Sequence, residues 1–121
     1  MYERVGGRPW FEALVERFYG DVETNPVLRP LYPASLTKPK VNLTEFLVQY
    51  WGGPQEYSGR RGHPRLRARH MGFAIGRAER DAWVATMTEA VKAGDLKPED
   101  EKEMLDYFDG AATFLINRPG P

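Results

Sequence analysis

The chain has 121 residues, no net charge at neutral pH and no cysteine. This length fits one core, so we expect a single domain over residues 1–121, with a short tail at 118–121. The balanced charge gives no general attraction to nucleic acid or to an anionic membrane, and the lack of cysteine excludes thiolate metal sites and thiol nucleophiles. No stretch is apolar enough to span a bilayer, and the N-terminus lacks a signal-peptide pattern, so we expect a cytoplasmic protein.

Apolar residues at helical spacing predict two helices in the first half of the chain. The first begins near Pro9, where a first turn tolerates proline, and ends near Asn25, because the proline after it disfavours a helical conformation there. A proline-rich corner over 26–33 and an irregular stretch over 33–39 follow. The second helix stops at the Gly-Gly-Pro of 52–54, and its apolar stripe consists of Leu43, Phe46, Leu47, Tyr50 and Trp51.

The second half predicts a loop and three more helices. A polar loop is expected over 55–62, followed by a short helix that begins at a proline and carries His70. The next helix has Trp83 just inside its start and ends at Gly94. The last begins at Pro98, whose three acidic successors complement a helix dipole. No segment alternates as a half-buried strand does, so the predicted fold class is all-α.

His70 has two interpretations. A lone histidine on an apolar helix face is usually a packed core residue. Neutral imidazole is also a common axial ligand of haem iron, and the short helix around His70 is flanked by more apolar and aromatic residues than so small an element needs. A zinc site would require three or four ligands, and the other histidine, His63, sits between a glycine and a proline, where a turn or capping role explains it better.

Six segments together resemble the group II truncated haemoglobins. They are VGG at 5–7, RFYGDV at 17–22, VLRPLYP at 27–33, QYWGGP at 49–54, RGHPRLRARH at 61–70 and ERDAW at 79–83. QYWGGP and GHPRLRxRH are specific in combination, and the similarity spans nearly the whole chain. It implies a globin-like two-over-two helical sandwich, a shortened first helix and a mostly extended loop before the helix that bears the haem-linked histidine.

The resemblance also assigns site residues. It makes His70 the proximal ligand of the iron of haem b, and it places Tyr19, Tyr32 and Trp83 on the distal side, where periodicity alone would favour core packing. Helical spacing makes Leu43, Phe46 and Leu47 pocket-lining and puts Phe73 on the side of its helix that carries the histidine.

A basic cluster precedes the candidate iron ligand in the sequence, and its members are Arg60, Arg61, Arg65, Arg67 and Arg69. Such a cluster can bind nucleic-acid phosphates, form a solvated face, or pair with the two haem propionates, which suit an arginine fork. We favour propionate pairing for Arg69, and the resemblance adds Tyr57 and Lys40 as further candidates. No nucleic acid or membrane is expected as a partner.

The segment between Pro33 and Leu43 departs from the pattern of these relatives. It is one residue shorter, and Pro39 falls near the position that gates the distal pocket, where a small residue is more familiar. The identity of the gate therefore stays open.

The expected function is reversible binding of dioxygen, carbon monoxide or nitric oxide at ferrous iron. Tryptophan donates and tyrosine can donate, so two such donors would retain a negatively polarised ligand on the order of a hundredfold longer than none. Nitric oxide dioxygenation or peroxide chemistry, each with a reductase partner, is one hypothesis, and no catalytic residue is assigned.

The sequence leaves other functions and the oligomeric state open. A sensor or an oxygen store without turnover has the same sequence features as an enzyme. A cofactor-free helical interaction module would leave His70 merely packed. The sequence is equally compatible with a monomer and a homodimer.

Overall fold

The computed structural model describes residues 1–61 and 75–116, and the regular structure in these ranges is helical. The all-α prediction is confirmed, whereas the tail expected at 118–121 lies outside the described residues. No helix in the described ranges is long and apolar enough to cross a membrane. In chain order the elements are α1 (Tyr2–Val5), α2 (Arg8–Val22), the 3-10 helix η1 (Arg29–Leu31), α3 (Thr37–Tyr50), α4 (Glu56–Arg61), α6 (Arg77–Lys92) and α7 (Pro98–Phe114).

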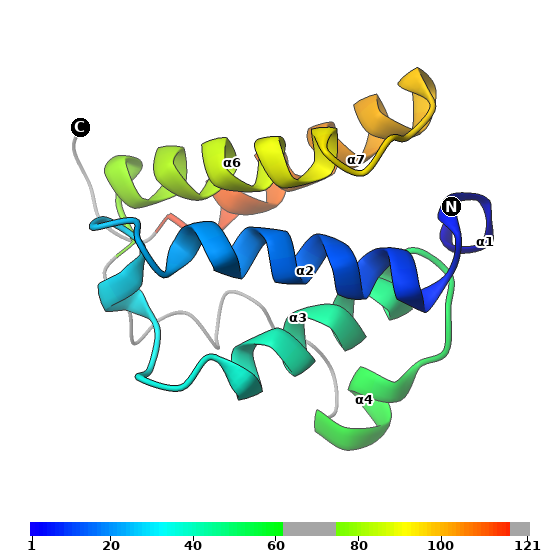
Figure 1. Ribbon diagram of the computed structural model, residues 1–121, viewed down its shortest axis with the longest axis horizontal. Helices are drawn as coiled ribbons and strands as arrows, with labels where there is room; N and C mark the ends of the chain where they lie inside the picture. Colours follow the sequence, from blue (N-terminus) through cyan, green and yellow to red (C-terminus); the bar gives the residue numbers. More distant parts are fainter. Residues whose placement is uncertain (62–74, 117–121) are drawn as a thin grey trace.

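Two pairs of antiparallel helices form the body of the molecule (Figure 1). α2 packs on α3, α6 packs on α7, and α2 also contacts α6, so it joins the two pairs. This position explains the apolar face of α2, whose buried residues recur every three or four positions. They are Phe11, Leu14, Val15, Phe18, Tyr19 and Val22.

The end of α2 falls three residues before the predicted end, for a local reason. The Asn25 side-chain oxygen accepts hydrogen bonds from the amides of Val27, at 2.9 Å, and Leu28, at 3.1 Å. An asparagine that binds backbone amides in this way favours a turn over a helix. The helix therefore ends at Val22, and the chain turns toward η1.

Two stretches that we expected to be irregular are partly helical. α3 begins at Thr37, which places Pro39 in a first turn, where amides have no intrahelical acceptor and the missing N–H costs little. α4 lies within the expected loop at 55–62. Gln49 ties it to α3, because its side chain donates to Ser58 Oγ at 2.7 Å and accepts from the Ser58 amide at 2.9 Å. That contact joins two elements, so apolar periodicity could not reveal it.

Candidate functional site

A cavity of about 390 Å³ is bordered by both helix pairs and by the corner that follows η1. Its volume lies within the range of about 300–1,000 Å³ that is typical of cofactor and small-molecule sites. Its walls are mainly apolar and aromatic side chains, with a few polar groups among them. This composition suits a mostly apolar ligand.

One wall comes from α3 and α4. The three residues predicted to line a pocket, Leu43, Phe46 and Leu47, all border the cavity. Tyr57 of α4 joins them, is buried, and meets the ring of Phe46 edge-on at a centroid distance of 5.6 Å. Pro39 borders the cavity too. It is the residue near the position of the distal gate, whose identity the sequence did not determine.

Three aromatic residues with polar atoms border the same cavity from other elements. Tyr19 comes from α2, Tyr32 follows η1, and Trp83 lies on α6. The rings of Tyr19 and Tyr32 meet edge-on at 5.4 Å. The structure therefore brings together the three residues expected on the distal side, and their function as ligand donors stays a prediction.

Burial keeps both tyrosines protonated. It raises the pKa of Tyr19 well above its ordinary value, and it raises that of Tyr32 as well. Hydrogen bonding from the Trp83 indole and from the Tyr19 hydroxyl lowers the pKa of Tyr32, and a partner has this effect when it donates toward the phenol oxygen.

Arg29 fixes the corner that presents Tyr32. Its guanidinium donates to three successive carbonyl oxygens, those of Tyr32 at 3.3 Å, Pro33 at 3.0 Å and Ala34 at 2.9 Å. The corner over 26–33 contains three prolines, which lack an N–H and cannot donate backbone hydrogen bonds. The Arg29 side chain supplies donors for carbonyl oxygens here instead.

Trp83 is held by rings on either side. Its indole packs against Phe18 of α2 at 5.3 Å and Phe108 of α7 at 5.6 Å. α6 itself begins with a capping contact, because the Gly76 amide donates to the Glu79 carboxylate at 2.7 Å. A tryptophan in the second turn of a capped helix, with aromatic neighbours from two other helices, has little freedom to move.

Several predicted site residues are not at the cavity or cannot be placed. The Lys40 ammonium pairs with Glu16 of α2 at 3.3 Å, and Lys40 is not among the residues that border the cavity. His70, Arg69 and Phe73 lie outside the described residues, so their assignment as iron ligand, propionate partner and haem contact stays a prediction. The same holds for the other members of the basic cluster, since the side chains of 60–61 and all of 62–74 are outside the described part.

Five residues that border the cavity were missed. They are Asn42 of α3, Ile75 before α6, Glu79 and Arg80 of α6, and Tyr107 of α7. The spacing could have revealed Arg80, because it precedes Trp83 by three residues and such residues share a helix face. Tyr107 had a weaker signal, its place beside the predicted stripe residue Phe108; burial raises its pKa, so it too stays protonated.

Comparison with known proteins decides the family. A family model described as bacterial-like globin matches residues 1–117. The chain belongs to the truncated globins. This truncated globin is 35% identical over 117 residues to the Group 2 truncated hemoglobin YjbI of Bacillus subtilis, a match that covers 97% of this chain and 88% of that protein.

Solved structures agree with the assignment. The thermostable hemoglobin of the actinobacterium Thermobifida fusca is 46% identical, with 98% of each chain covered and a TM-score of 0.96. The hemoglobin of Chloroflexus aurantiacus is also 46% identical, with 97% of each chain covered and a TM-score of 0.94. The predicted resemblance to group II truncated haemoglobins, and the globin-like fold that it implied, are both confirmed.

Membership of this family implies haem and diatomic gas ligands. The described walls of the cavity fit such a group. Apolar and aromatic side chains from α3, α4 and α7 would contact a porphyrin, and three proton donors gather where α2, the corner after η1 and α6 meet.

Proposed function

We propose that this truncated globin holds haem b in the cavity, with His70 as the iron ligand, and reversibly binds dioxygen and other diatomic ligands. The observation that carries the proposal is the gathering of Tyr19, Tyr32 and Trp83 at one apolar cavity. Haem would supply a ferrous iron to which diatomic ligands attach. The protein would supply a dry pocket and directed hydrogen bonds.

The hydrogen-bond donors at the cavity would stabilise negative charge on a bound ligand. A ligand that carries partial negative charge accepts a hydrogen bond from the protonated Tyr32, whose oxygen in turn accepts from Trp83 and Tyr19. In a poorly solvated pocket such linked hydrogen bonds strengthen one another. A hydrogen bond to a charged partner contributes about 1.5–3 kcal/mol, and about 1.4 kcal/mol is tenfold in an equilibrium constant. Slow loss of the ligand is therefore expected.

The candidate partners of the haem propionates include residues inside and outside the described part of the chain. The buried Tyr57 already borders the cavity and can donate its hydroxyl proton. Arg69, the residue that the sequence favours for this pairing, lies outside the described residues. Lys40 would have to leave Glu16 first, so we assign it a smaller share.

The test is the visible absorption spectrum of the purified protein in ferric, reduced and carbon monoxide-treated form. The wild type should show a strong Soret band that shifts with carbon monoxide, and His70→Gly should lose haem or its normal ligation. His63→Gly is the matched control, and it should keep the wild-type spectrum. If folded wild-type protein does not take up excess haem, the proposal is wrong.

Turnover is the second candidate function, favoured by the donor-rich wall. A ligand held for long enough can react, and in nitric oxide dioxygenation NO, O₂ and one electron from a reductase yield nitrate. Reduced protein in air should then consume nitric oxide as long as a reductant is supplied. An oxygen store or sensor would bind ligand without continued consumption, and peroxide chemistry would need hydrogen peroxide as oxidant.

A further inference from the structure

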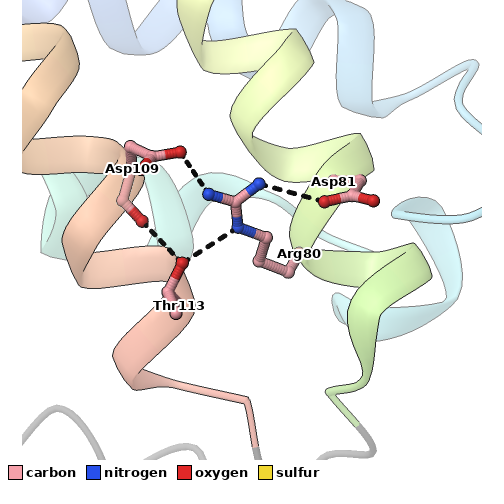
Figure 2. Close-up of polar contacts among 4 residues, drawn as sticks. All are labelled: Arg80, Asp81, Asp109 and Thr113. Carbon is pink, nitrogen blue, oxygen red and sulfur yellow. Dashed lines mark hydrogen bonds and ion pairs between the residues drawn. The ribbon is translucent and has the colours of Figure 1, made fainter. Parts of the chain in front are cut away.

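Arg80 joins the two helices that form the far wall of the cavity. Its Nε donates to Thr113 Oγ1 at 3.1 Å, one terminal nitrogen donates to Asp81 at 3.0 Å, and the other donates to Asp109 (Figure 2). Thr113 and Asp109 belong to α7, whereas Arg80 belongs to α6. We call Arg80, Asp109 and Thr113 the α6–α7 clasp.

The clasp is fixed on both sides. Thr113 Oγ1 accepts from Arg80 and donates to the backbone oxygen of Asp109 at 3.0 Å, so the two α7 residues are also joined to each other (Figure 2). The Arg80 side chain is 19% exposed and that of Asp109 is 59% exposed, so solvent partly screens this ion pair and the restraint comes from several contacts together. A planar guanidinium whose three nitrogens each face a protein acceptor retains little freedom.

The clasp lies one turn away from the distal tryptophan. Phe108, directly before Asp109 in the sequence, packs its ring on Trp83 at 5.6 Å. Ala112, directly before Thr113, borders the cavity, as does Arg80 itself. A contact that sets the separation of α6 and α7 at this level therefore also sets where the indole stands relative to the cavity.

We propose that Arg80 is a positioning residue for Trp83, because the α6–α7 clasp holds the indole N–H in the place from which it serves the distal network. This inference rests on the proposed function. Each Arg80 nitrogen already faces an oxygen of Asp81, Asp109 or Thr113, so Arg80 acts through Trp83 and not by touching the ligand. Without the clasp, α6 can shift against α7, and the ligand leaves sooner.

The first measurement is the dioxygen dissociation rate of the haem-loaded Arg80→Met variant, which keeps an unbranched side chain and removes the fork. The rate should rise about threefold to tenfold, the size of effect expected for a residue that acts through a packed neighbour. Arg80→Lys, which keeps the charge without the fork, should give an intermediate rate. The control is Arg4→Met, which breaks the 2.9 Å ion pair with Asp100 near the start of α7 and should leave the rate unchanged.

The second measurement is independent of ligand kinetics. In the carbon monoxide complex, the indole N–H resonance of Trp83, assigned by its loss in Trp83→Phe, should move in Arg80→Met and stay in place in Arg4→Met. Asp109→Asn should move it in the same direction, and it serves as the second variant if Arg80→Met folds poorly.

The outcomes separate this inference from the proposed function. If Arg80→Met lowers the unfolding temperature while the dissociation rate and the indole resonance stay at wild-type values, Arg80 is only structural and the inference is wrong. If Trp83→Phe leaves the dissociation rate unchanged, the donor role of Trp83 is wrong. A displaced indole resonance in Arg80→Met would still support positioning in that case.

Discussion

Two aromatic clusters in this truncated globin use the same residue types in different ways. The cavity cluster consists of Tyr19, Tyr32 and Trp83. The N-terminal cluster consists of Tyr2 and Trp10, whose rings both meet the ring of Phe11. In the cavity cluster, hydroxyl and indole groups act on one another beside the cavity. In the N-terminal cluster, the Trp10 indole donates to the Gly94 carbonyl at 3.0 Å. The backbone amide of Tyr2 donates to the backbone carbonyl of Trp51 at 2.9 Å.

Glycines close the space around the N-terminal cluster. A Cβ on Gly53 would lie 2.6 Å from Val48 and 2.7 Å from the Tyr2 ring, and one on Gly94 would lie 2.6 Å from Trp10. At the cavity, large rings stand around open volume instead. The comparison teaches that aromatic residue type does not separate binding from packing, whereas the space around the rings does. The predictions below change residues in or beside these clusters, and each considers both the dioxygen dissociation rate and the stability of the fold.

The largest effect is expected from Tyr32→Phe, which removes the hydroxyl from the cavity cluster. The dioxygen dissociation rate should rise about tenfold to a hundredfold, because a hydrogen bond to a charged partner is lost, and the unfolding temperature should change little. Because burial holds the pKa of Tyr32 above its ordinary value, the wild-type rate should be constant from neutral pH to about 10, the ordinary tyrosine pKa. A rate that rose near pH 8 would contradict a protonated Tyr32 as donor.

Gly53→Ala should give the converse result. The added methyl group overlaps Val48 and Tyr2, and overpacking of this kind costs about 1–3 kcal/mol in the free energy of unfolding. Ligand dissociation should stay at the wild-type rate, since the cavity lies elsewhere. Gly20→Ala is the matched control: its Cβ meets nothing within 4 Å, and alanine inside a helix should stabilise by about 0.5–1 kcal/mol. Equal destabilisation by both variants would show that the tight contact at Gly53 is not the cause.

The smallest effect is expected from exchanging the two indoles for phenyl rings. Trp10→Phe leaves the Gly94 carbonyl without its donor and should cost about 1 kcal/mol of stability, with ligand kinetics unchanged. Trp83→Phe should speed dioxygen dissociation by about tenfold, with a smaller loss of stability. Chemical denaturation and stopped-flow ligand replacement on both variants make the comparison. If Trp83→Phe leaves the dissociation rate at the wild-type value, the indole does not stabilise the ligand.

The long helices were predictable because their apolar residues recur every three or four positions and so lie on one face of the helix. Phe11, Leu14 and Phe18 of α2 are all buried, as their period predicts. The boundaries were less predictable, since the end of α2 depends on the side chain of Asn25. α4 was missed because a contact with α3 through Gln49 holds it, and a contact between elements leaves no periodic trace.

The cavity residues divide in a similar way. Leu43, Phe46 and Leu47 follow from helical spacing, and the structure places them at the cavity. Tyr32 lies in a corner without period, so only the resemblance to a family could single it out. Arg80 was missed because a charged residue on a helix is expected to face solvent, and its partners on α7 come from a distant part of the chain.

The way Arg29 restrains the corner over 26–33 affects how the rigidity of Tyr32 can be measured. The corner is restrained by a side-chain guanidinium that binds the carbonyl oxygens of Tyr32, Pro33 and Ala34. Hydrogen–deuterium exchange reports the protection of backbone amides, and three residues of the corner over 26–33, Pro26, Pro30 and Pro33, have no amide hydrogen. Exchange rates would therefore understate how rigidly Tyr32 is presented, whereas carbonyl carbon chemical shifts and the exchange of the Arg29 side-chain protons would report it directly.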